Sequence, residues 1–368
     1  MQNDELLYNI ALTKIDKVGA VTAKTLISYC GSAKEIFKEH KSRLMKIPQV
    51  GSAIANATKD KVVFEKAEKE IEFILKNEVN VLFYLDDNYP YRLKNYTDSP
   101  VILYYQGNAN LNKEKVIAVV GTRRITEYGK DLVSHLIKGI VDQDILVVSG
   151  LAYGVDSLAH KLCVHEQIHT VGVLGHGLDR IYPLENKKLS LQMLKCGGLL
   201  TEFGIDTKPD RENFPMRNRI VAGMSDAVVV VETKRDGGSM ITAEIANNYN
   251  KDVFAFPGRI NDNLSSGCNY LIKNHKAQLI ESPEDLILNM RWDVSNTRNK
   301  QIQQKMFIDL TDEEQSIVKI LQNGNDAHVD IFYQNLELSP SKLASVLLHL
   351  EFNGVIKALP GKKYSLIQ

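Results

Sequence analysis

Residues 121–124, Gly-Thr-Arg-Arg, follow an apolar run from Val116 to Val120 and have the chemistry of a phosphate-binding loop. The run is short and β-branched, as in a strand buried on both faces, and a helical pattern begins near Thr126. The N–H groups of a strand-to-helix loop, with the helix N-terminus behind them, form a site for an anion. Arg123 and Arg124 add positive charge, so the sequence predicts phosphate binding here.

Other glycine-rich or basic stretches stand where later strands are expected to end. Residues 149–156 contain small side chains that let the backbone approach a ligand, and residues 211–219 form a basic cluster beside an aromatic. In residues 237–243, Ser239 can cap a helix and leave its N–H groups free for an anion. Carboxyl ends of parallel strands share one edge of a sheet, so these loops are expected to converge on a groove for a polyanion.

The elements that must position these loops alternate between strand-like and helix-like stretches from residue 115 to about 289. Strands are predicted at 116–120, 145–149, 169–174, 227–232 and 252–256, and helices near 126–140, 154–166, 185–195 and 239–250. Right-handed crossovers between such strands give an α/β fold, a Rossmann-like doubly wound parallel sheet.

An N-terminal domain of short helices is predicted for residues 1–78. Residues 15–21 and 47–53 share an apolar residue, a glycine turn and a small-residue helix start, and so resemble the units of SAM/helix-hairpin-helix-like domains. Val21 and Ala53 stand at the usual second glycine, which favours a helical bundle without DNA contact. Aromatic edge strands between residues 79 and 107 are expected to lead into a central domain that spans 79–290.

A polar linker is predicted at 291–306, followed by a winged-helix domain at 307–368. A capping box at 311–314 opens a first helix to about Gln322, a second helix falls near 329–335, and a third begins at Ser339 and Pro340 before a hairpin. The third helix would read DNA, but Lys342 and His349 are its possible cations. A protein contact or weak DNA contact is therefore favoured.

The composition limits the classes of function. Positive and negative residues number 45 each, so nucleic-acid binding requires a local basic patch. The four cysteines lie far apart without C-x-x-C spacing, which indicates neither a zinc site nor a disulfide framework. The start of the chain lacks a basic leader and no later run is long and apolar enough for a bilayer, so a cytoplasmic protein without membrane contact is expected.

Catalysis has little support in the residue patterns. Gly121 stands alone where a dinucleotide site needs G-x-G-x-x-G, and Ser149 lacks the G-x-S-x-G context of a hydrolase nucleophile. The four histidines between residues 160 and 176 straddle a helix and a strand with no carboxylate or thiol at ligand spacing. Neither a metal nor a cofactor is predicted.

Six motifs taken together resemble the DprA/Smf family, the DNA processing proteins of bacterial natural transformation. They are residues 120–124, 149–156, 177–183, 214–223, 238–243 and 253–258. The resemblance is strong from about 107 to 285, and the flanking helical and winged-helix domains agree with it in order.

This resemblance implies sequence-independent binding of single-stranded DNA, protection of incoming strands, loading of the RecA recombinase, a homodimer through the Rossmann-like domain, and no catalysis. DNA or phosphate contacts are expected at Gly121, Thr122, Arg123, Arg124, Ser149, Gly150, Ala152, Gly154, Lys187, Arg211, Phe214, Arg217, Asn218, Arg219, Ser239 and Met240. A base is expected to stack on Phe214 or Tyr153. Tyr153, Leu184 and Gly237 depart from residues common in the family, which predicts a weaker groove.

Two alternatives stay open. Residues 237–244 are similar to the P-G-G-x-G-T-x-x-E loop of nucleotide phosphoribohydrolases, with Glu244 at the position of the acid, although the proline is absent. A structural adaptor without DNA contact is the other alternative. Release of ribose from a nucleoside monophosphate would indicate the enzyme, and an adaptor would show no salt-dependent DNA binding.

Overall fold

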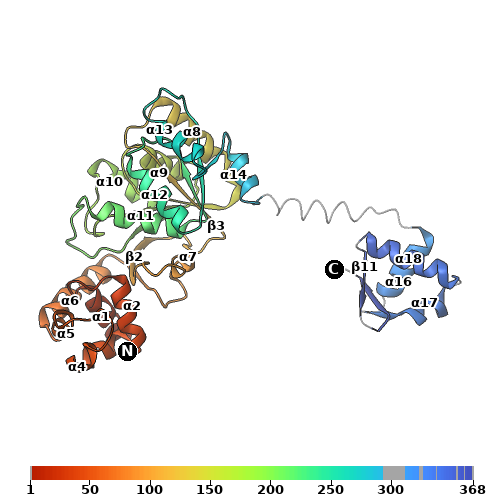
Figure 1. Ribbon diagram of the computed structural model, residues 1–368, viewed down its shortest axis with the longest axis horizontal. Helices are drawn as coiled ribbons and strands as arrows, with labels where there is room; N and C mark the ends of the chain where they lie inside the picture. Colours follow the sequence, from red (N-terminus) through yellow and green to blue (C-terminus); the bar gives the residue numbers. More distant parts are fainter. Residues whose placement is uncertain are drawn as a thin grey trace. The chain divides into compact units, whose positions relative to one another are not determined.

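The computed structural model of the protein describes residues 2–292, 311–322, 326–336, 338–353, 355–359 and 361–366. Two compact units comprise Met1–Met290 and Arg291–Gln368 (Figure 1). Nearly all of the predicted linker at 291–306 lies outside the described residues. None of the described helices has the length and apolar composition that a membrane span requires.

A nine-stranded sheet forms the centre of the first unit, in the order β1-β2-β6-β5-β4-β3-β7-β8-β9 (Figure 1). Its strands are β1 (Asn80–Phe83), β2 (Ile102–Gly107), β3 (Lys115–Val120), β4 (Ile145–Ser149), β5 (Thr170–Val173), β6 (Gly197–Thr201), β7 (Ala227–Val230), β8 (Asp252–Ala255) and β9 (Gln278–Leu279). The strands from β6 to β9 in this order run parallel to their neighbours, as predicted. β1–β2 and β2–β6 are antiparallel, and β2 lies inside the sheet rather than at its edge.

Helices lie on both faces of this sheet, as a doubly wound fold requires (Figure 1). They are α7 (Tyr91–Lys94), α8 (Glu127–Gly139), α9 (Val155–His165), α10 (Lys187–Met193), α11 (Asn213–Met224), α12 (Gly238–Asn248), α13 (Ser266–Lys273) and α14 (Pro283–Asn289), with 3-10 turns η1 (Val141–Gln143) and η2 (Leu184–Asn186). The predictions for α8, α9, α10 and α12 are confirmed to within a few residues.

Six helices precede the sheet: α1 (Gln2–Thr13), α2 (Ala20–Cys30), α3 (Ala33–Lys38), α4 (Lys41–Leu44), α5 (Ser52–Ala57) and α6 (Lys61–Lys76). α2 and α5 begin directly after Gly19 and Gly51, as the repeated pattern predicts. Their apolar side chains form one cluster with residues of β1 and β2, including Phe83, Ile102 and Tyr104. The helices therefore pack on the antiparallel end of the sheet, within the same compact unit.

The second unit contains the helices and the hairpin that were predicted for a winged helix. It contains α16 (Asp312–Gln322), α17 (Val329–Asn335), α18 (Pro340–Phe352) and a three-stranded sheet of β10 (Ala327–His328), β12 (Lys363–Leu366) and β11 (Ile356–Leu359). The capping box is confirmed, since Thr311 and Glu314 exchange hydrogen bonds through their side chains and backbone N–H groups. Ser339 accepts from the Lys342 N–H as N-cap, and Pro340 follows at the first helical position.

Candidate functional site

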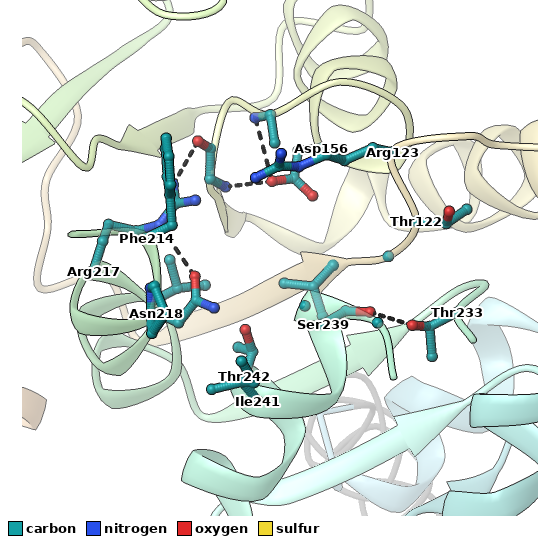
Figure 2. A pocket seen from close by; sticks show the side chains of 18 of the residues that line it. Thr122, Arg123, Asp156, Phe214, Arg217, Asn218, Thr233, Ser239, Ile241 and Thr242 are labelled. Atoms are coloured by element: carbon teal, nitrogen blue, oxygen red, sulfur yellow. Dashed lines mark hydrogen bonds between the residues drawn. The ribbon is translucent and has the colours of Figure 1, made fainter. Parts of the chain in front are cut away.

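A groove of about 740 Å³ opens at the carboxyl ends of β3 and β7 (Figure 2). The chain passes from β3 to β4 on one side and β7 lies on the other, so this is the point where the strand order reverses. Ligands of open α/β sheets bind at such a point. The groove is lined by the loops after β3, β4, β5, β6 and β7, by α11 and by the N-terminal half of α12.

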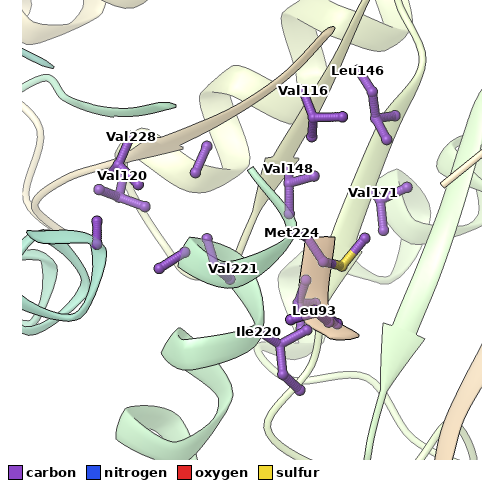
Figure 3. Packing of buried hydrophobic residues seen from close by; sticks show 14 of the residues in the cluster. Leu93, Val116, Val120, Leu146, Val148, Val171, Ile220, Val221, Met224 and Val228 are labelled. Atoms are coloured by element: carbon purple, nitrogen blue, oxygen red, sulfur yellow. The ribbon is translucent and has the colours of Figure 1, made fainter. Parts of the chain in front are cut away.

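α11 is held against the sheet by a continuous apolar face. Ile220, Val221 and Met224 pack on valines and leucines of β3, β4, β5 and β7 (Figure 3). Phe214 and Arg217 precede them at helical spacing and therefore turn to the same side, where they reach the groove. The prediction assigned no secondary structure to 211–219, because Pro215 and three arginines obscure the helical pattern. Proline is tolerated here since it lies in the first turn.

The loop after β3 brings one arginine into the groove. A β-carbon on Gly121 would lie 2.5 Å from Val155 and 3.0 Å from the Glu232 carbonyl oxygen, so this tight passage requires glycine. The Arg123 guanidinium lies 5.4 Å from the centre of the Phe214 ring, in cation–π contact. Arg124 is also exposed but does not line the groove. The two adjacent arginines thus have different surroundings.

Two expected anion-binding donors near this loop are already used within the protein, which corrects the prediction. The Thr122 N–H donates to the Glu232 carbonyl oxygen at 2.6 Å. At the start of α8, the buried Glu232 carboxylate accepts from the Thr126 N–H at 3.0 Å and from its hydroxyl at 2.7 Å. The chain's own carboxylate therefore takes the place of an external anion at this helix N-terminus.

Arg217 is buried rather than exposed in the groove. Its side chain is 4% exposed, and it donates to the carbonyl oxygens of Gly150 and Val173, at the ends of β4 and β5. Burial lowers the pKa of Arg217 to about 10, an effect that the nearby Asp156 opposes. Burial raises the pKa of Asp156, while Arg217 and the N–H groups of Ala152 and Gly150 act in the opposite direction. The guanidinium thus joins α11 to β4 and β5 and supplies a positive charge at the floor of the groove.

Arg219 is a second correction, because it lies outside the groove. It donates to the Asp98 carbonyl oxygen and pairs with Glu202, whose side chain is largely buried. Residues two apart on a helix do not share a face, so Arg217 and Arg219 cannot both reach one groove. A helix predicted for residues 211–219 would have placed Arg217 and Arg219 on different faces.

The start of α12 faces the groove without a side-chain cap (Figure 2). The N-cap is Gly237 rather than Ser239, which lies inside the first turn and donates its hydroxyl to Thr233 at 2.7 Å. The prediction of a Ser239 cap is therefore wrong. Its consequence remains for Gly238 and Ser239, whose N–H groups have no acceptor among the described residues and which line the groove. The Met240 N–H instead donates to the Gly237 carbonyl oxygen at 3.0 Å.

The loop after β4 is mainly structural. The buried Ser149 hydroxyl donates to the Val119 carbonyl oxygen at 2.6 Å, while Gly150 and Ala152 line the groove. Gly154 has φ +78° and a β-carbon there would lie 2.2 Å from the Thr122 carbonyl oxygen. Tyr153, expected as a stacking residue, instead donates to Glu185 at 2.6 Å outside the groove.

Several expected contacts lie elsewhere, and several lining residues were missed. Lys187, Met240, Ser149, Gly154, Arg124 and Arg219 do not line the groove, whereas Gly121, Thr122, Arg123, Gly150, Ala152, Arg211, Phe214, Arg217, Asn218 and Ser239 do. Tyr182 and Lys234 also line it, and the Tyr182 and Phe214 ring centres lie 6.0 Å apart. Lys234 lies just past the predicted strand at 227–232, and this position at a strand end could have identified it as a lining residue.

The charges of the groove are predominantly positive. Its basic lining residues are Arg123, Arg211, Arg217 and Lys234, against the carboxylates of Asp156 and Asp236. Arg123, Arg211 and Lys234 are exposed, and none forms an ion pair within the described part of the chain. Such cations remain available for phosphate oxygens.

No set of metal ligands stands out in the described regions. They contain no group of three or more His, Cys, Asp or Glu side chains that could hold a metal. His160 is buried and shares a 2.6 Å hydrogen bond with Thr170, and burial lowers its pKa to about 3. Glu244, the acid position of the phosphoribohydrolase alternative, is absent from the groove lining and pairs with Lys276 at 3.0 Å.

The family models and the relatives that match this chain agree on one family. The family of DNA recombination-mediator protein A matches residues 80–291, and the DprA winged helix domain matches 308–362. The DNA processing protein DprA of Streptococcus pneumoniae is 41% identical over 208 residues, which cover 56% of this chain and 73% of that protein. The Escherichia coli protein Smf is 33% identical over 276 residues, 74% of each chain.

Solved structures agree with these matches. An X-ray structure of DprA from Streptococcus pneumoniae has a TM-score of 0.63 at 32% identity and covers 77% of this chain and 97% of that chain. DNA processing protein A from Helicobacter pylori, a structure concerned with its single-stranded DNA binding mode, has a TM-score of 0.54 at 31% identity and covers 59% and 97%. The chain therefore belongs to the DprA/Smf family of DNA processing proteins.

Proposed function

We propose that the groove binds single-stranded DNA by its phosphates and does so without sequence preference. The observation that carries this proposal is the convergence of three exposed, unpaired cations, Arg123, Arg211 and Lys234, on the uncapped start of α12. Two aromatic side chains, the exposed Tyr182 and the half-buried Phe214, also line the groove. The binding mode named for the relative from Helicobacter pylori supports the same ligand.

The chemistry explains the lack of sequence preference. Arginine forks bond two phosphate oxygens, and helix N–H groups donate to a phosphate whatever base the nucleotide carries. Every base has a face that can stack on Tyr182 or Phe214. Each neutralised phosphate contributes about 0.7 to the slope of log affinity against log salt for a single strand. Three cations and one helix start thus give modest affinity in one groove.

The larger role we propose is protection of incoming DNA and loading of the RecA recombinase on it during natural transformation. Self-association as a homodimer through the first unit would join two grooves on one strand. The second groove would then bind at high effective concentration, which raises avidity without new contacts. Sedimentation with and without oligonucleotide measures the stoichiometry, and a strand-exchange assay with RecA measures loading.

The deciding experiment measures binding of fluorescent oligothymidine to the full chain across a salt series, with the matching duplex as competitor. Arg123→Ala is the test variant. Arg43→Ala, another exposed arginine on α4, is its matched control because it lies outside the groove. We expect salt-sensitive, single-strand-preferring binding that Arg123→Ala weakens and Arg43→Ala does not. Absence of wild-type binding at low salt would overturn the proposal and favour a scaffold or nucleotide hydrolysis.

A further inference from the structure

A buried ion pair joins the N-terminal helices to the loop between β6 and α11. Glu70 of α6 is 2% exposed and pairs with Lys14, which follows α1. Both Glu70 carboxylate oxygens also accept from the Ile205 N–H, at 3.0 and 3.1 Å. A carboxylate that satisfies a backbone donor and a lysine at once fixes the position of that backbone.

Apolar packing surrounds this pair. Phe73 and Ile74 of α6 lie with Phe203 and Ile205 of the loop around one small void. A β-carbon on Gly204 would lie 2.1 Å from the Lys14 ammonium and 2.3 Å from Glu70, so the loop backbone passes directly over the ion pair. The start of the loop is therefore held by the N-terminal helices rather than by solvent-exposed turns.

The same loop ends as a wall of the groove. Its middle is fixed by a 3.3 Å hydrogen bond from the Gly177 N–H to the Thr207 carbonyl oxygen, and Pro209 and Arg211 then line the groove. The Arg211 side chain makes no hydrogen bond or ion pair with any described residue, so its place depends on its backbone. That backbone runs unbroken from the Glu70 contact into α11.

A second contact from the N-terminal helices acts on the same region. Lys24 of α2 donates to the Ser99 hydroxyl at 2.7 Å and to the Tyr96 and Thr97 carbonyl oxygens, each at 3.2 Å. In that turn the Asp98 carbonyl oxygen accepts from Arg219 of α11. The N-terminal helices thus reach both the loop before α11 and the helix itself.

We infer that Glu70 and Lys14 are positioning residues for DNA binding, which set the location of Arg211 in the groove from a separate helical layer. This inference rests on the proposed function of the groove. In the folded protein the N-terminal helices contribute to affinity without touching DNA. Loosening the ion pair removes one phosphate contact, that of Arg211, and leaves Arg123 and Lys234 in place.

The test uses Glu70→Gln in the full chain, because glutamine keeps the shape but presents an amide where Lys14 needs a carboxylate. We expect Glu70→Gln to lower the salt slope of oligothymidine binding by about 0.7, the value for one phosphate contact. Its loss of affinity should not exceed that of Arg211→Ala. In the double variant the two losses should not add, because both remove the same contact. Lys14→Met should reproduce the result if Glu70→Gln folds poorly.

Hydrogen exchange supplies a readout that does not depend on DNA. Amides of residues 203–212 should exchange faster in Glu70→Gln than in wild type, with the exchange of β3 unchanged. Asp226→Asn is the matched control, since it removes a partly buried pair with Arg92 near the start of β7, at the opposite end of the strands from the groove. It should leave the salt slope unchanged.

The outcomes separate the inference from the proposed function. An unchanged slope in Glu70→Gln, or additive losses with Arg211→Ala, would overturn the positioning role while wild-type binding stands. A lower active fraction with an unchanged slope indicates only instability and also contradicts the inference. Absence of wild-type binding would overturn the proposed function and this role together.

Discussion

The groove and the third helix of the winged-helix unit both carry cations in places where proteins contact nucleic acid, yet the surroundings of these cations differ. On α18, Lys342 pairs with Glu313 at 3.2 Å and His349 with Glu314 at 2.6 Å, both on α16. In the groove, Arg123 and Arg211 have no carboxylate partner among the residues described. The third helix of a winged helix is the usual DNA-reading element, yet here its cations are paired with carboxylates while those of the groove are not.

For phosphate binding, the availability of a cation therefore matters more than its presence. The whole chain has zero formal charge, and α18 follows that average. The groove departs from it because the loops after β3, β6 and β7, together with α11, bring basic side chains to a concave site with few acidic neighbours. Available and compensated cations should therefore respond differently to substitution.

The largest effect is expected for Arg217, which lies in the groove but is compensated by buried groups. Arg217→Ala leaves Asp156 and the Gly150 and Val173 carbonyl oxygens without their cation. Loss of one member of a buried charge network costs about 3–5 kcal/mol, so the free energy of unfolding should fall by that amount. Urea unfolding measures it, and Arg211→Ala serves as control with a change below about 0.5 kcal/mol. Equal stability of the two variants would contradict the structural role of Arg217.

The next largest effect is a dependence of the stability of the first unit on pH, caused by the buried His160. Its pKa is lowered to about 3, first by burial and then by Arg217, whereas the unfolded value is near 6.5. The unfolded chain therefore binds a proton below pH 6.5 that the folded chain does not. The contribution of neutral His160 to stability is fully present above that pH, and the free energy of unfolding falls by about 2 kcal/mol from pH 7 to pH 5. His160→Gln should remove this contribution, while the buried His176, whose pKa burial also lowers, keeps its own dependence in the same direction.

The control for this effect is His165, on the same helix and 79% exposed. His165→Gln should keep the wild-type dependence on pH. The winged-helix unit should respond only at lower pH. Burial acts to raise the pKa of Glu314, but hydrogen bonds from His349 and Thr311 outweigh it and lower the pKa, so its contribution is lost below about pH 4.5. If both units lose stability together near pH 6, the assignment to His160 is wrong.

The two adjacent arginines of the loop after β3 should differ in their effect on DNA binding. Arg123→Ala should weaken oligothymidine binding by about 1.5 kcal/mol, roughly tenfold, and lower the salt slope by about 0.7. Arg124→Ala should have a smaller effect, because Arg124 is exposed but absent from the groove lining. Fluorescence anisotropy across a salt series measures both. An equal loss in the two variants would mean that the strand leaves the groove across Arg124.

The sequence predicted the framework better than the site. β-branched runs, capping residues and glycine turns are local signals, and they located the parallel strands and the winged helix. β6 begins with Gly197 and Gly198 and lacked such a signal, and α11 was hidden by its arginines. Which donors were already used could not be predicted, because the partners of Thr122, Arg217 and Arg219 lie far along the chain. The loop chemistry indicated Arg123, and the basic cluster beside an aromatic indicated Phe214, whereas Tyr182 was found as a lining residue only in the fold.

The smallest effect on DNA binding is expected for the Lys342–Glu313 ion pair of α18. Glu313→Gln removes the partner of Lys342 and should change stability by less than about 0.5 kcal/mol, as expected for an exposed ion pair. In an Arg123→Ala background, the freed lysine should raise affinity for duplex DNA about twofold at low salt. Lys342→Ala alone should leave DNA binding unchanged, because a compensated cation contributes little to a phosphate contact. If Lys342→Ala weakens binding as much as Arg123→Ala does, pairing with Glu313 does not prevent α18 from contacting DNA, and the two regions act on the same ligand.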